Sequence, residues 1–441
     1  MAIREPNERL DLLFRETGWT ERQMAQAVNR IGTERGTPTK YQQPSAHQWL
    51  KGCIPKTTTQ PLILEALARR LGRPVTHDQA GFPARPDQSE SYSLLEDLID
   101  LGRQDMERRN FLGVSIFAAA MPVPAWAEAV ERRESVRSGA TQRVGMSDVE
   151  LVGKMTEQLF ATFNSFGGRY TRPMAATFMV DFVAPYLRLD GPPDVQRKML
   201  SAAAYLCYNI GWMAVDEGVH GLAQRWYVKG LELAQAGGDR KWYSYILRGL
   251  SGQAVDLEHA SDAVRFANSA AASSPETTPR LKAFMLGQQA HSFAVAGERT
   301  AALRTIRETE RQIEKAESPP GPFGGYDPSV VAYHASQVRY YLGDLEGSIE
   351  SLHLHFRLRR PNDTRRSAAR FNSMLAERQL ELGHLEAACA TWGGVLDEYP
   401  TLHSGRVDRH VADIPRLLNP YLSNATARQT YERAQETRRT A

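Results

Sequence analysis

Residues 41–55, YQQPSAHQWLKGCIP, decide the fold of the N-terminal part of this 441-residue chain. Ser45 can cap a short helix, Gly52 ends that helix, and Pro55 prevents its extension. Three apolar residues are spaced to face a core: Ala46, Trp49 and Leu50. Five polar residues are placed outward: Gln42, Gln43, His47, Gln48 and Lys51. The pattern predicts a short helix with an apolar inner face and an amide-rich outer face.

Three more helices are predicted around this stretch. Residues 7–16 carry apolar side chains at helical spacing, and Gly18 ends that segment. Thr20 is placed as the N-cap of a second helix, with Gln23 at the capping-box position. The residues that this second helix is predicted to bury are Met24, Ala25, Val28 and Ile31. A glycine-bearing connection at 32–38 precedes the short helix, and a fourth helix is predicted at 61–71.

Such a set of short helices suits a helix-turn-helix module, in which the N-terminal part of the recognition helix enters the major groove of DNA. Glutamine can pair bidentately with adenine, while lysine and arginine contact guanine or phosphate. The alternative is an ordinary small helical bundle whose glutamines are only solvated. The W-L-x-G-x-x-P ending of the short helix favours the helix-turn-helix.

A wider set of residues follows one pattern: Gly18-Trp19, Ala25, Val28-Asn29, Ser45-Ala46, Trp49-Leu50-Lys51-Gly52, Pro55, Ala66-Leu67 and Leu71-Gly72-Arg73-Pro74-Val75-Thr76. The pattern resembles the Xre-type (Cro/C1-like) helix-turn-helix of actinobacterial regulators. The resemblance implies a DNA-binding domain over residues 1–85, with residues 43–48 reading bases. The candidate DNA-binding residues are Lys40, Gln42, Gln43, Ser45, His47, Gln48, Lys51 and Lys56, of which the three lysines would meet phosphates. The connection at 32–42 is longer than in compact phage repressors, which leaves the start of the recognition helix open.

The charge of the chain is unevenly placed. Residues 1–85 hold 13 Lys and Arg against 8 Asp and Glu, whereas the remainder holds 41 against 43, for a net charge of +3. A basic head on a neutral body favours contact with double-stranded DNA through the head alone. The three cysteines, Cys53, Cys207 and Cys389, form no metal-ligand grouping, so we expect reduced thiols in a cytoplasmic protein and no bound metal.

Residues 108–127 imitate a twin-arginine export signal, beginning with Arg108-Arg109-Asn110-Phe111-Leu112. Real signals lie at the N-terminus, and this apolar run is interrupted by Pro122 and Pro124 and is too short to span a bilayer. The regulators that the chain resembles often carry an RRxFL stretch at this junction. We therefore predict a linker at 86–147 with a buried bridging helix, and no membrane partner.

The body, residues 148–441, shows an internal repeat of helical pairs. A turn residue opens each copy and a small residue follows it five positions later. The copies are Gly218 and Ala223, Glu258 and Ala263, Gly297 and Ala302, Gly343 and Ser348, and Gly383 and Ala388, at spacings of 40, 39, 46 and 40. A loop at 318–329 accounts for the longest spacing, and residues 148–189 would add a capping helical pair. Since one such unit cannot bury its apolar face alone, neighbouring units stack.

The repeats resemble tetratricopeptide repeats loosely. Together these patterns predict an all-α protein with an N-terminal helix-turn-helix domain, a linker helix and a C-terminal tetratricopeptide-like α-solenoid. The first helix of each repeat would line a concave groove for a peptide or small-molecule effector. The candidate groove residues are Tyr205, Tyr208, Asn209, Tyr245, Arg248, Gln288, His334, Arg370 and Asn372. The plainer alternative is that these tyrosines are packing residues and the arginines a solvated face.

No catalytic constellation stands out: the chain has no Walker loop, HExxH, GxSxG or dinucleotide fingerprint, and His353 and His355 lie on opposite sides of a helix. We therefore expect no enzyme activity, cofactor or metal. The resemblance implies a homodimeric, sequence-specific transcriptional regulator of development or secondary metabolism that responds to an effector. The first rival is a protein-interaction scaffold whose head only tethers it to DNA. The second is a phosphatase-like enzyme acting in the groove.

Overall fold

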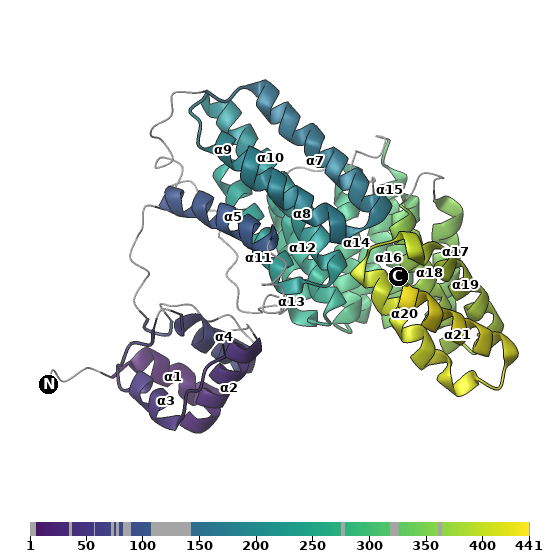
Figure 1. Ribbon diagram of the computed structural model, residues 1–441, viewed down its shortest axis with the longest axis horizontal. Helices are drawn as coiled ribbons and strands as arrows, with labels where there is room; N and C mark the ends of the chain where they lie inside the picture. Colours follow the sequence, from purple (N-terminus) through teal and green to yellow (C-terminus); the bar gives the residue numbers. More distant parts are fainter. Residues whose placement is uncertain are drawn as a thin grey trace.

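The computed structural model describes residues 6–34, 38–56, 58–71, 75, 79–82, 90–106, 143–274, 278–317, 326–359 and 364–440. Apart from one isolated bridge between Arg143 and Asp190, the regular structure in these ranges is helical, which confirms the all-α prediction (Figure 1). None of the helices in these ranges is long and apolar enough to cross a membrane.

Four helices form an N-terminal unit, which we call the head. They are α1 Glu8–Thr17, α2 Glu21–Glu34, α3 Gln43–Leu50 and α4 Gln60–Leu71. The predicted capping box at the start of α2 is confirmed: Thr20 N donates to Gln23 Oε1 at 2.8 Å, and Gln23 N donates to Thr20 Oγ1 at 3.3 Å. The apolar residues predicted to face inward form one cluster that includes Met24, Val28 and Trp49.

The head differs from the sequence prediction at both ends of the α2–α3 connection. Helix α2 continues through Gly32 to Glu34, so the connection begins after Glu34 and not at the predicted Gly32. Helix α3 has Gln42 at its N-cap in place of the expected Ser45, and Pro44 lies in its first turn. Proline suits this position because its φ is already helical and the first-turn N–H needs no helical partner.

Helix α5, Glu90–Met106, lies on the body and contacts α8 and α11. Its buried Asp105 pairs with Arg172 and accepts a hydrogen bond from Trp226 Nε1 at 2.7 Å. The twin-arginine stretch at 108–127, where the bridging helix was predicted, lies outside the described residues. The helix that the structure describes inside the predicted linker is therefore an earlier one, anchored by a buried carboxylate.

The body is a succession of helical pairs (Figure 1). Its elements are α7 Met146–Phe166, α8 Gly168–Phe178, the π-helical turn η2 Met179–Val183, α9 Ala184–Leu187, α10 Pro193–Glu217, α11 His220–Ala236, α12 Arg240–Asp256, α13 Ala260–Ser273, α14 Pro279–Val295, α15 Arg299–Glu314, α16 Pro328–Tyr341, α17 Leu345–Leu358, α18 Arg365–Glu381, α19 Leu385–Glu398, η3 Tyr399–Thr401, α20 Gly405–Leu418, η4 Asn419–Tyr421 and α21 Ala425–Thr440. From α10 onward each odd-numbered helix packs against the even-numbered helix before it.

The turn residues of the predicted repeat share one backbone conformation. Gly218, Gly297, Gly343 and Gly383 have φ between 75° and 89°, and Glu258 has φ 60°. Glu258 is the one non-glycine residue with positive φ in the part of the chain that the structure describes. The small residues five positions after these turns are fully buried: Ala223, Ala263, Ala302, Ser348 and Ala388. A left-handed residue reverses the chain and a small side chain lets the paired helices approach, which explains the repeat.

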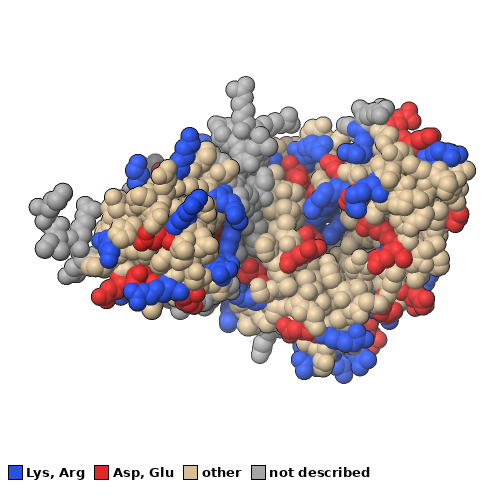
Figure 2. Space-filling model, turned by 90° about the horizontal axis from the view of Figure 1, so that it is seen from below, with Lys and Arg blue, Asp and Glu red and all other residues tan. Residues whose placement is uncertain are grey.

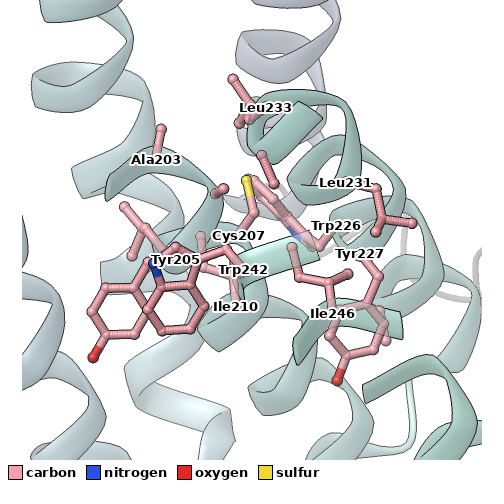
Figure 3. Close-up of a cluster of buried hydrophobic side chains, with 14 of the residues drawn as sticks. Ala203, Tyr205, Cys207, Ile210, Trp226, Tyr227, Leu231, Leu233, Trp242 and Ile246 are labelled. Carbon is pink, nitrogen blue, oxygen red and sulfur yellow. The ribbon is translucent and has the colours of Figure 1, made fainter. Parts of the chain in front are cut away.

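The largest hydrophobic cluster in the described residues runs from α5 to α14, and Figure 3 shows side chains from the part where α10, α11 and α12 meet. Tyr205 of α10 stacks on Trp242 of α12 with ring centroids 4.4 Å apart and planes at 10°. Trp226 and Cys207 are buried beside them, and burial raises the pKa of the Cys207 thiol. The cluster joins the first two repeats into one core.

The array of pairs closes on itself. Helix α7 contacts α18, and α20 contacts α10, although these elements are far apart in the sequence. The backbones of the two ends nearly touch at two glycines: a Cβ on Gly405 would lie 2.5 Å from Glu217 O, and one on Gly167 would clash with His403 O. His403 N also donates to Phe166 O at 2.9 Å. Closure turns the concave side of the solenoid into an interior.

Candidate functional site

The outer face of α3 is open to solvent. Most of the predicted DNA-binding residues are exposed: Lys40, Gln42, Gln43, His47, Gln48, Lys51 and Lys56, with Ser45 half-buried. On the inner face, Ala46, Trp49 and Leu50 are buried, and the Tyr41 ring meets Trp49 edge-on at 5.0 Å. Because its inner side chains are fixed by packing, α3 holds the polar set on one side of the head.

One acidic residue lies among these side chains. Glu21 Oε1 is 2.7 Å from His47 Nδ1, and Gln43 Nε2 donates to Glu21 Oε2 at 3.3 Å. Figure 2 shows Lys and Arg side chains on the head, at the left of the view, with Asp and Glu among them. The positive charge of the head is therefore interspersed with negative charge, and Glu21 orients two of the predicted base-reading residues.

The second candidate site is a cavity of about 270 Å³ inside the closed array. The first helices of all five repeats, α10, α12, α14, α16 and α18, contribute to its walls, together with α7 and α20. Its aromatic lining residues are Phe160, Tyr208, Trp212, Phe284, Tyr326, Tyr333 and Phe371, and its charged ones are Arg248, Asp256, Asp327, Arg359, Arg366, Arg370 and Arg406.

The structure brings together five of the nine predicted groove residues. Those that line the cavity are Tyr208, Arg248, Gln288, His334 and Arg370. The other four lie elsewhere: Tyr205 and Asn209 are buried in the core, while Tyr245 and Asn372 are partly buried outside the lining. Tyr205 and Asn209 are one turn apart on the face of α10 that packs against its neighbours, and Asn209 Nδ2 donates to Tyr205 O at 3.1 Å.

Two carboxylates, one fully buried and one partly buried, tie the far ends of the array together at the cavity. Asp216 of α10 accepts from Arg366 Nη1 of α18 at 2.7 Å and from Ser404 Oγ at 2.9 Å. Asp256 of α12 pairs with Arg370 of α18 at 3.2 Å and with Arg406 of α20. Among these residues only Arg370 was predicted from the sequence. Both aspartates lie two positions before a turn residue of the repeat. This position was the one feature of the sequence that could have pointed to them.

Burial and neighbouring charges shift the titration of the groups at the cavity. Burial, with a smaller contribution from nearby arginines, lowers the pKa of His291 to about 3 and that of His334 well below its usual value. Burial alone would raise the pKa of Asp256, but Arg406 and Arg370 outweigh it and lower the pKa. At neutral pH His291 and His334 are uncharged, so these two side chains add nothing to the positive charge of the arginines.

We expect the body to lose stability as the pH falls from 6.5. His291 has a folded pKa of about 3 against 6.5 for an unperturbed histidine, so the unfolded chain binds more protons between these values. At pH 5 this difference costs about 2 kcal/mol. Denaturant unfolding at pH 7 and pH 5 measures the loss. In a His291→Gln variant the loss should shrink by a similar amount, and an unchanged loss would contradict the assignment to His291.

No group of three His, Cys, Asp or Glu side chains in the described ranges is arranged to hold a metal ion. His355 is buried against Ser329 O, whereas His353 is exposed. Among curated proteins, none matches the chain. Residues 10–83, which cover most of the head, match the family model of an SP15 N-terminal domain.

Proposed function

We propose that this protein is a sequence-specific, DNA-binding transcriptional regulator whose closed helical body senses an effector. The observation that carries the proposal is the exposed polar face of α3, where Gln43, Gln48 and Lys51 project from a helix whose other side is packed. Amide side chains in the first turns of a short helix can pair with base edges in the major groove, and lysines around that helix can contact phosphates. The proposal assigns no catalytic residue, cofactor or metal.

In this proposal the head is an Xre-type helix-turn-helix, with α2 preceding the recognition helix α3. Residues of both helices share one core, which supports a fixed angle between them. The Lys40, Lys51 and Lys56 side chains, exposed on either side of α3, would contact the DNA backbone. The resemblance to actinobacterial Xre–tetratricopeptide regulators suggests a role in development or secondary metabolism.

A homodimer belongs to the proposal because one short recognition helix reads too few base pairs for specificity. An apolar stripe on α7, α8 and η2 supports it. Tyr170 and Met174 lie four residues apart on α8, Phe182 follows on η2, and Phe166 ends α7 just before the turn at Gly167; each is more than half exposed. Exposed apolar side chains gathered in this way are typical of protein–protein interfaces.

We expect Met174→Glu to weaken dimerisation by about tenfold or more, because a carboxylate would be buried without a partner in an apolar interface. Sedimentation velocity over a range of concentrations measures the shift from dimer to monomer. Leu354→Glu is the matched control, since Leu354 is exposed on α17, away from the stripe. A dimer that Met174→Glu leaves intact would place the interface elsewhere.

The decisive experiment is selection of bound DNA from a random pool by the full-length protein at physiological salt. A recurring palindromic sequence is expected, because two symmetric heads read two half-sites. Recovery of no consensus, with binding that depends on salt but not on sequence, would favour the scaffold, whose head only tethers the body. The acidic Glu21 among the base-reading side chains is the feature of the head that most favours this rival.

The body would act as the sensor. Its closure joins elements from both ends of the array around one cavity, so a ligand there can favour one arrangement of the helices. For the effector to control DNA binding, it must bind two arrangements of the protein with different affinity. Once the effector class is known, this link is tested by measuring the affinity of the effector for the closed body and for a body whose array has been opened.

A further inference from the structure

The cavity of the body has a surplus of positive charge. Five arginines line it against two aspartates. Asp327 is already engaged at the start of α16, where it accepts hydrogen bonds from Ser329 N and Val330 N. Asp256 is shared by Arg370 and Arg406. Arg366 is paired with Asp216, which lies outside the lining. Among the described residues, these three carboxylates still leave positive charge over at the cavity.

Arg248 contributes most directly to this surplus. Its Nε donates to Phe284 O at 2.9 Å, its guanidinium lies 3.7 Å from the centre of the Phe284 ring, and Nη2 is 3.4 Å from His334 Nε2. No carboxylate lies within ion-pair distance of it in the part of the chain that the structure describes. A guanidinium held by a carbonyl and a ring keeps N–H groups for an anion.

Several polar atoms of the lining have no hydrogen-bond partner. These buried atoms include Arg366 Nε, Arg406 Nε, Tyr326 Oη, His334 Nδ1 and His291 Nε2. Each of the five side chains belongs to a residue at most 6 % exposed. Buried polar groups in proteins almost always have partners, so their gathering around one cavity indicates a ligand. The arginine and tyrosine atoms are donors and require an acceptor such as a carboxylate or phosphate oxygen.

The remaining walls are aromatic and enclose little space. Trp212, Phe284 and Phe371 come from three different repeats, and Tyr333 stacks on Phe371 with centroids 4.4 Å apart. The volume of about 270 Å³ lies just below the roughly 300–1,000 Å³ of ordinary small-molecule sites. It admits one small molecule with a planar apolar part, and it is too small for an extended peptide of several residues.

We propose that this cavity binds a small organic anion, whose carboxylate or phosphate contacts Arg248 and the free donors of Arg366 and Arg406 while its apolar body lies against the aromatic walls. The proposed anion names the chemical class of the effector. Its regulatory meaning rests on the proposed function. Arg366 and Arg406 also join α18 and α20 to α10 and α12. A bound anion therefore stabilises the closed array.

Phenyl phosphate and phenylacetate are suitable probes, with phenylacetamide as the uncharged control. Calorimetric titration and thermal unfolding of the full-length protein, in the absence of DNA, measure binding. We expect at least one anion to bind and to raise the unfolding temperature at millimolar concentration, and the amide to do neither. The stronger of the two anions identifies the head group. Equal effects of the amide and the anions, or no binding of either anion, would overturn the proposal.

Arg248→Met removes the charge and keeps a stem that can pack on Phe284, without leaving a carboxylate unpaired. Binding of the preferred anion should weaken about tenfold or more, because a charge-assisted hydrogen bond is lost. Arg357→Met, on the exposed side of α17, is the matched control and should bind normally. Tyr326→Phe, which removes one donor only, should weaken binding a few-fold and serves if Arg248→Met fails to fold. Unchanged affinity in both cavity variants would contradict the site.

These assays separate the two proposals. Anion binding is measured without DNA, and selection of DNA from a random pool is carried out without anion. A protein that binds a defined DNA sequence but none of the anions keeps its regulator role and loses this effector class. A protein that binds the anion but no defined DNA sequence keeps the site and loses the regulator role.

Discussion

Replacing Asp216 with asparagine is expected to lower the free energy of unfolding of the body by about 3–5 kcal/mol, because it leaves a buried guanidinium without its counter-charge. Asp216 is fully buried and accepts from Arg366 Nη1 at 2.7 Å, from Ser404 Oγ at 2.9 Å and from Gly168 N at 3.3 Å. These contacts join α10 to α18, to the start of α20 and to the start of α8. Chemical denaturation measures the loss, and an increased radius of gyration in small-angle scattering would report opening of the closed array.

Asp413→Asn is the control for this substitution. Asp413 forms an exposed pair with Arg416 at 3.0 Å within α20, and such surface pairs contribute about 0–1 kcal/mol. Adding Arg366→Met to Asp216→Asn should recover part of the lost stability, because the unpaired charge is then removed as well. Equal stability of Asp216→Asn and Asp413→Asn would show that the buried carboxylate does not hold the array closed.

The double substitution of Gln43 and Gln48 by alanine is expected to weaken binding to the selected DNA sequence by about a hundredfold or more. Each bidentate pairing of an amide with a base discriminates by about 1–3 kcal/mol, and both side chains are exposed on α3. The head should keep its stability, since neither residue belongs to its core. Fluorescence anisotropy with the selected duplex and with a scrambled one measures the change.

Gln158→Ala, an exposed glutamine on α7, provides the matched control for this measurement. Affinity for scrambled DNA should change little in the double variant, because non-specific binding comes from lysines and phosphates. A Lys51→Ala variant should show the opposite behaviour, with similar losses for both duplexes and a weaker dependence on salt. If the double variant still prefers the selected sequence, α3 does not read bases through its glutamines.

Local patterns predicted the elements of this protein well. The capping box of Thr20 and Gln23, and the inward spacing of Ala46 and Trp49, depend on residues within one or two helical turns. The repeat could be found for the same reason, since a left-handed turn residue such as Glu258 and a small residue five positions later act within one helical pair. The start of α3 was mispredicted because Ser45 is a residue type that suits an N-cap, whereas in the structure Gln42 is the N-cap and Pro44 lies in the first turn.

The sequence by itself therefore determined the helices, their pairing and the polar outer face of α3, because these follow from interactions between residues close in the chain. The tertiary structure alone decided that the array closes and that its concave side becomes an arginine-rich cavity. Arg366 meets Asp216, and Arg406 meets Asp256, across 150 residues of sequence in each case. Whether such contacts form depends on the small rotation between successive helical pairs, added up over the whole solenoid. A local periodicity of the sequence does not contain that sum.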